Sequence, residues 1–244
     1  MFFKLKERRR KIFVEKYIDK MKSLERILEQ YKVSESTGVS LSDYVALYET
    51  IRLIKPKFVL ECGTGKSTWI ISQAMLDNCA DSQGNDMKLV SMEHNKKWAD
   101  HAVSILPERF KSFVEICHSP MDTYCYSFVR GTIYKEVPDH PYEFVFVDGP
   151  SQGLEGTGTM CNMDFIRVVE KSQTPVSAII DNRKHTVLAY SLIFGTDKVR
   201  LYSNWSGLGV VNKVTCNDMV LRDKQLVKKY LLKSRIQVEN GNPF

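Results

Sequence analysis

The sequence lacks any long apolar run, and this absence limits the classes of protein it can encode. A membrane-spanning helix needs about 20 consecutive apolar residues, and no stretch of the sequence approaches that length. Lys4 interrupts the first apolar residues, and acids follow at Glu7, Glu15 and Asp19, so neither a signal peptide nor a transit peptide is expected. The sequence therefore predicts a cytoplasmic protein whose 244 residues suffice for one α/β domain.

Cysteine is present without any metal-binding or disulfide pattern. None of the six cysteines forms a C-x-x-C pair or a cluster with zinc-ligand spacing. Cys62 and Cys117 lie in apolar runs typical of core strands, where a free thiol packs as a small hydrophobic group. We expect all six thiols to be reduced and structural.

An excess of positive charge is confined to one end of the chain. Residues 1–32 carry eleven Lys or Arg and five Asp or Glu, so the formal net charge of +6 belongs to this segment. Apolar residues recur there at spacings of three and four between Phe13 and Tyr31, which predicts an amphipathic helix. The basic face could contact RNA or an anionic membrane. We favour a helix docked on the domain, because acids are interleaved with the basic residues.

From Ser42 onward, the sequence alternates between helical and strand patterns. Such alternation requires right-handed crossovers and a parallel sheet. The expected strands cover 58–60, 88–92, 112–117, 142–147 and 176–180, and the expected helices cover 42–54, 67–79, 96–106, 163–170 and 184–194. We therefore predict an α/β fold with a mostly parallel, seven-stranded sheet and helices on both faces, completed by a late antiparallel hairpin from strands 198–203 and 208–214.

Three regions follow from this pattern. We assign residues 1–55 to an N-terminal helical extension, 56–216 to the core and 217–244 to a basic tail with a helix over 218–235. Residues 124–138 fit no strand–helix unit, and we expect a lid or an irregular crossing there.

The most informative motif is the turn after the first strand. An apolar strand ends in Glu61, two glycines follow at Gly63 and Gly65, and a helix begins with Ser67 or Thr68 as its cap. Glycines allow a ligand close to the backbone, and N–H groups at a helix start can face its polar part. In parallel sheets such ligands bind at the carboxyl ends of the strands.

Two ligand classes compete for this turn. Lys66 with the following Ser67 and Thr68 is similar to the end of a phosphate-binding P-loop, typical of nucleotide phosphohydrolases and kinases. That motif needs a glycine where Leu60 lies within the strand, and the loop is too short to wrap a triphosphate. The acid-x-Gly-x-Gly pattern instead resembles the first motif of class I S-adenosylmethionine-dependent methyltransferases, whose third glycine is replaced here by Ser67.

This resemblance implies a Rossmann-like fold and a cofactor-binding set. It places the methionine part of S-adenosylmethionine at the glycine turn, including Thr64. Glu93, after the second strand, suits the two ribose hydroxyls because a carboxylate can accept from both. His94 is beside it, and Ser119 and Met121, after the third strand, are expected near the adenine.

Acids also follow the fourth and fifth strands. Asp148, followed by a glycine-rich loop at 151–158 that we interpret as an acceptor-binding flap, could contact the cofactor amine or orient the acceptor. Asp148 with Asp181 and Asn182 resembles the oxygen-ligand set of catechol-type O-methyltransferases, which implies Mg²⁺. These side chains could instead cap the next helix, and His185 or Lys184 could be the base of a metal-free enzyme.

The sequence thus predicts methyl transfer from S-adenosylmethionine to a small-molecule acceptor, through a hydroxyl oxygen of a sugar or phenol. Asp148, Asp181 and His185 are the expected catalytic residues. The alternatives are a binding module of the same fold, recruited to RNA or membrane by the basic N-terminus, and the P-loop enzyme.

Overall fold

The computed structural model describes residues 7–9, 11–12, 15, 41–80, 86–202 and 207–221. Residues 7–9, 11, 12 and 15 are helical. The apolar stripe expected at 13–31, the turn at 204–206 and the C-terminal helix beyond 221 lie outside the described residues. In the described part of the chain, no helix is long and apolar enough to cross a membrane.

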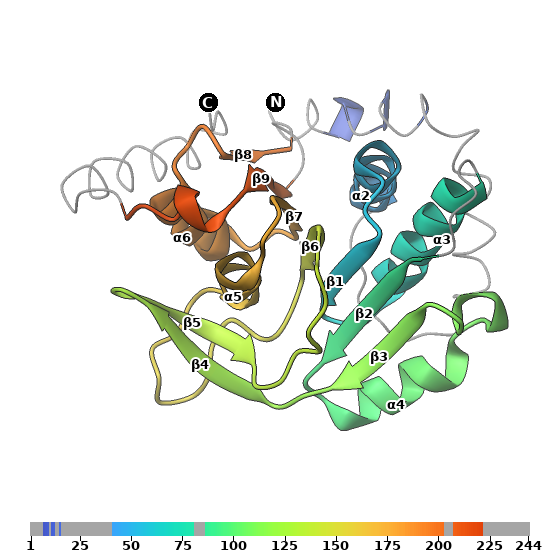
Figure 1. Cartoon of the computed structure of the whole chain (residues 1–244), viewed down its shortest axis with the longest axis horizontal. Coiled ribbons are helices and arrows are strands. Elements are labelled where there is room, and N and C mark those ends of the chain that lie inside the picture. Colours follow the sequence, from blue (N-terminus) through green and yellow to red (C-terminus); the bar gives the residue numbers. More distant parts are fainter. Residues whose placement is uncertain are drawn as a thin grey trace.

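A seven-stranded sheet forms the centre of the fold (Figure 1). Its order is β3-β2-β1-β6-β7-β9-β8, with the first five strands parallel and β9 antiparallel to both neighbours. The strands are β1 (Phe58–Cys62), β2 (Lys88–Glu93), β3 (Val114–His118), β6 (Phe144–Val147), β7 (Val176–Ile180), β8 (Val199–Leu201) and β9 (Gly209–Val214). The predicted sheet and its late antiparallel pair are confirmed.

Helices cover both faces of the sheet, as predicted (Figure 1). They are α2 (Leu41–Ile54), α3 (Lys66–Ala80), α4 (Lys96–Ile105), α5 (Asp164–Lys171) and α6 (Lys184–Phe194). Because side chains alternate along a strand, the sheet separates two hydrophobic clusters. Val59 and Phe146 join α2 and α3 on one face, whereas Leu60 and Val147 join α5 and α6 on the other.

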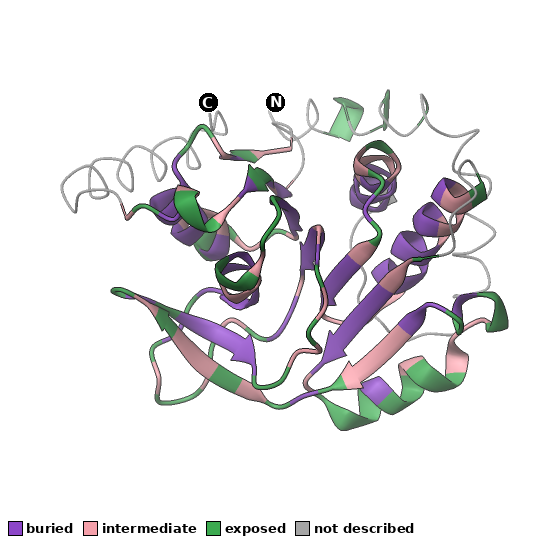
Figure 2. Cartoon of the chain, viewed as in Figure 1, coloured by how far each residue is buried: buried purple, intermediate pink, exposed green. Residues whose placement is uncertain are grey.

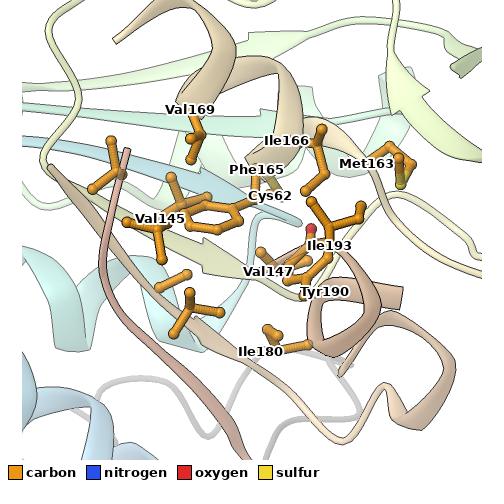
Figure 3. Close-up of a cluster of buried hydrophobic side chains, with 14 of the residues drawn as sticks. Cys62, Val145, Val147, Met163, Phe165, Ile166, Val169, Ile180, Tyr190 and Ile193 are labelled. Atoms are coloured by element: carbon orange, nitrogen blue, oxygen red, sulfur yellow. The ribbon is translucent and has the colours of Figure 1, made fainter. Parts of the chain in front are cut away.

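The central strands of the sheet are buried along most of their length (Figure 2). On the second face, Phe165 of α5 packs against Tyr190 of α6 with the ring planes tilted by 36° and the ring centroids 5.3 Å apart (Figure 3). On the first face, α2 contributes buried residues from Tyr44 to Ile51. Residues 41–54, part of the N-terminal extension that the sequence predicts, share the core on this face of the sheet.

The segment at 124–138 is neither a lid nor an irregular crossing, so that prediction was wrong. Residues 121–134 form a two-stranded antiparallel hairpin, β4 (Met121–Tyr126) and β5 (Val129–Tyr134), outside the main sheet. Ser127 at its tip has φ 54°, a conformation uncommon for a residue other than glycine. Gly131 lies so close to the loop after β6 that a Cβ would be 2.4 Å from the Cys161 carbonyl oxygen.

Candidate active site

The carboxyl ends of the parallel strands bring the predicted residues to one edge of the sheet (Figure 1). Cys62 at the end of β1 pairs with Met92 of β2 on one side and with Val147 of β6 on the other. The residues that follow these strands are therefore neighbours. The edge gathers the glycine turn, Glu93, Asp148 and Asp181, as the sequence predicted.

The glycine turn is held by hydrogen bonds within the protein. The N–H groups of Gly63 and Thr64 both donate to the Met92 carbonyl oxygen, at 3.0 and 3.1 Å, and Gly65 N–H donates to Thr68 Oγ1 at 3.1 Å. These three N–H groups already have acceptors within the protein, since Gly63 and Thr64 bond to the end of β2 and Gly65 bonds to the first turn of α3. A P-loop cradles phosphate with such N–H groups, so the bonding at Gly63 and Thr64 argues against that class. Helix α3 also begins one residue before the expected start, at Lys66.

Gly63 is required by close packing. Its φ is 103°, and a Cβ would lie 2.8 Å from the Asp148 carbonyl oxygen. The contact is mutual, since a Cβ on Gly149 would lie 2.8 Å from Gly63 Cα and 2.5 Å from the Tyr134 hydroxyl. Glycine at these two positions lets the ends of β1 and β6 approach each other.

Glu61 is fully buried, and its hydrogen bonds hold the glycine turn in place. Its Oε2 accepts hydrogen bonds from Thr68 Oγ1 and Ser91 Oγ, both at 2.6 Å, and Ser91 Oγ also lies 2.6 Å from Thr64 Oγ1. Burial raises the pKa of Glu61 to about 7, although hydrogen bonding to Ser67, Ser91 and Thr68 opposes the shift. The structure therefore places Glu61 beneath the turn, where it fixes the side chains of neighbouring elements.

Glu93 lies at the end of β2 and is 7 % exposed. Its Oε1 accepts from Asn95 N–H at 2.8 Å and lies 3.1 Å from Nδ1 of His94. Among the described residues, the hydrogen bond and the ion pair of Glu93 both involve Oε1, and none involves Oε2. Glu93 is thus held rigidly by one oxygen, while the other can accept from a ligand.

The residues expected near the adenine lie after β3. Ser119 is buried, its N–H donates to the Glu93 carbonyl oxygen at 2.9 Å, and its Oγ accepts from Glu136 N–H at 2.9 Å. Met121 begins β4 and is partly exposed. Ser119 therefore connects the end of β3 to the segment that follows β5.

Asp148 and Asp181 form a carboxyl pair after β6 and β7. Burial raises the pKa of both groups. The pKa of Asp181 reaches about 7, because the charges of Asp148 and of Asp43 in α2 add to the effect of burial. Interaction between the two carboxyl groups lowers the pKa of Asp148 and raises that of Asp181.

Arg183 is the main site residue that the sequence analysis missed. Its Nη2 donates to the Asp148 carbonyl oxygen and lies 3.2 Å from Asp148 Oδ1. Its Nη1 donates to the Pro150 carbonyl oxygen and to Asn162 Oδ1, both at 3.0 Å. The only available signal was its position directly after Asp181-Asn182, because Asn162 comes from a distant loop.

The remaining predicted residues lie at the start of α6. Lys184 and His185 are exposed, and Asn182 has φ 38°. A Cβ on Gly207 would lie 2.6 Å from Asn182 Oδ1, so the amide of Asn182 packs against the segment leading into β9. No group of three or more His, Cys, Asp and Glu side chains is arranged to hold a metal within the described residues.

Comparisons with known proteins identify the fold. No protein-family model matches the sequence, and no curated protein matches it. A candidate caffeoyl-CoA O-methyltransferase from Staphylococcus aureus aligns with a TM-score of 0.55 at 15% identity, over 84% of this chain and 99% of that one. An O-methyltransferase from Bacillus cereus in complex with SAH aligns with a TM-score of 0.47 at 17% identity, over 78% and 91% of the two chains. The first alignment shows that the chain has the fold of a class I methyltransferase.

Proposed function

We propose that the chain is an S-adenosylmethionine-dependent methyltransferase that acts on a hydroxyl oxygen of a small molecule. The observation that carries this proposal is Glu93, a buried carboxylate beside the glycine turn with one oxygen bonded and the other without a partner among the described residues. A ribose presents two adjacent hydroxyl donors, and a carboxylate at this strand end suits them. The methyltransferase-like fold and the convergence of four strand ends support the same cofactor.

The acceptor would lie on the side of Asp148 and Asp181. Transfer forms an oxygen–methyl bond as the sulfur–methyl bond of the cofactor breaks, and the acceptor proton must be removed. We assign that proton to the Asp148–Asp181 pair, because a base whose pKa is near the working pH is the most effective and the pKa of Asp181 is about 7. S-adenosylmethionine supplies an activated methyl group, so the chain mainly positions the two reactants.

Several further residues belong to this proposal. The loop at 151–158 follows Asp148 and would cover the acceptor, and it carries its own hydrogen bonds, such as Leu154 N–H to Thr159 Oγ1 at 3.0 Å. His185 is an alternative proton acceptor at the start of α6. A sugar or a phenol remains the proposed acceptor class.

Calorimetric titration with S-adenosylmethionine tests the cofactor assignment. A hydrogen bond to a charged group contributes about 1.5–3 kcal/mol, so Glu93→Gln should weaken binding roughly 10- to 100-fold. Glu108→Gln is the matched control, since the Glu108 side chain is 88% exposed and forms a surface ion pair with Lys111. Binding of ATP or NAD without S-adenosylmethionine would refute the proposal, and equal affinities for the wild type and Glu93→Gln would remove Glu93 from the site.

A further inference from the structure

The predicted metal ligands do not form a site that fits a divalent cation. Mg²⁺ requires near-octahedral oxygen ligands at about 2.0–2.1 Å, and one of the carboxylates expected to bind it already has a cationic partner. Arg183 Nη2 lies 3.2 Å from Asp148 Oδ1 and also donates to the Asp148 carbonyl oxygen. Asn182, the expected neutral ligand, has its Oδ1 packed against Gly207.

Arg183 is held too firmly to be displaced easily from this position. Both terminal nitrogens have two acceptors each, and the side chain is 18% exposed. Asn162, which accepts from Nη1, is fully buried, and its Nδ2 donates to the Pro150 carbonyl oxygen at 2.7 Å and to Thr132 Oγ1 at 3.2 Å. A planar guanidinium loses little freedom in such a fork of acceptors, so its charge is fixed beside Asp148.

We propose that the Arg183 guanidinium occupies the place of a divalent cation beside Asp148, and that this chain transfers its methyl group without a bound metal ion. A metal on Asp148 and Asp181 would lie next to a fixed positive charge in a partly buried site, where like charges repel strongly. Arg183 then balances the charge of Asp148 and positions that carboxylate. The catalytic part of this inference rests on the proposed function, whereas the absence of metal binding does not.

Titration with Mn²⁺, followed by electron paramagnetic resonance of the free ion, tests the inference on the full chain. We expect the wild type to leave Mn²⁺ free at millimolar concentration, and its affinity for S-adenosylmethionine to agree within twofold in EDTA and in Mg²⁺. One Mn²⁺ bound per chain at micromolar concentration, and lost in Asp148→Asn, would overturn the inference. Failure to bind S-adenosylmethionine in either buffer would count against the proposed function and leave the Mn²⁺ result readable.

Two variants assign the effect to Arg183. Arg183→Met removes the charge beside the carboxyl pair and should bind Mn²⁺ at least 10-fold more tightly than the wild type. Arg167→Met is the matched control, because Arg167 also donates to a backbone carbonyl, that of Tyr134 at 2.9 Å, and forms none of the described hydrogen bonds or ion pairs of Asp148. Circular dichroism establishes that each variant is folded. An unchanged Mn²⁺ affinity in folded Arg183→Met would refute the proposal that Arg183 excludes a divalent cation. If that variant does not fold, the wild-type titration alone decides whether the chain binds Mn²⁺.

Discussion

Asp164 should make the stability of the fold depend on pH in the neutral range. It begins α5, is fully buried, and accepts a hydrogen bond from Tyr134 N–H through Oδ1 at 3.0 Å. Its Oδ2 is buried and has no hydrogen-bond partner among the described residues. Burial raises the pKa of Asp164 from 3.8 to about 7, although the Tyr134 N–H and the charge of Arg167 oppose the shift.

The sign and size of the effect follow from proton linkage. Between pH 3.8 and 7 the folded chain keeps the Asp164 proton while the unfolded chain has lost it, so the free energy of unfolding falls as the pH rises. Each pKa unit corresponds to 1.36 kcal/mol, which gives a loss of about 3 kcal/mol between pH 5 and 8. Asp164→Asn keeps an acceptor for Tyr134 and cannot ionise, so it should lack this loss.

Urea unfolding at pH 5, 6, 7 and 8 measures the effect. From pH 5 to pH 8, the free energy of unfolding of the wild type should fall by about 3 kcal/mol relative to that of Asp164→Asn. Asp197→Asn, which changes an exposed aspartate, should follow the wild type. Parallel pH profiles for Asp164→Asn and the wild type would refute the reasoning, because they would mean that Asp164 ionises equally in both states.

Two further substitutions test local packing and helix capping. Gly149→Ala should lower the free energy of unfolding by about 3 kcal/mol, because the added Cβ would lie 2.5 Å from the Tyr134 hydroxyl. Thermal unfolding should separate it from Gly153→Ala, where the nearest atom is 4.0 Å away, and similar losses in both variants would contradict the packing argument. Asn95→Ala should cost about 1 kcal/mol, since Asn95 Oδ1 accepts from the first turn of α4; an unchanged urea midpoint would show that this cap does not stabilise the helix.

Local patterns were sufficient to predict most of the fold. Alternation of apolar strands with amphipathic helices placed all seven strands of the main sheet, and α6 was predicted at its observed bounds. The hairpin at 121–134 was missed because its strands mix polar and apolar residues, because β4 is partly exposed, and because both strands pack on distant elements. The Tyr126 hydroxyl, for example, donates to the Met219 carbonyl oxygen at 2.7 Å. The two residues are 93 positions apart, so local sequence patterns cannot predict this contact.

The candidate site shows the same division. Glu93, Asp148 and Asp181 could be named from the sequence alone, because parallel strands necessarily bring their carboxyl ends to one edge. The bonding of the glycine turn to β2 could not be predicted, since it depends on how closely β1 and β2 approach.

The sequence by itself determined the order of the elements and the residue types at the strand ends, because periodicity and glycine placement are local properties. Only the tertiary structure decided which groups pair. Arg183 meets Asp148 through a contact across 35 positions, and Asn162, from a separate loop, holds the guanidinium in place. Such pairing depends on distances between elements that fold together, and it sets the charge that a ligand meets at this edge.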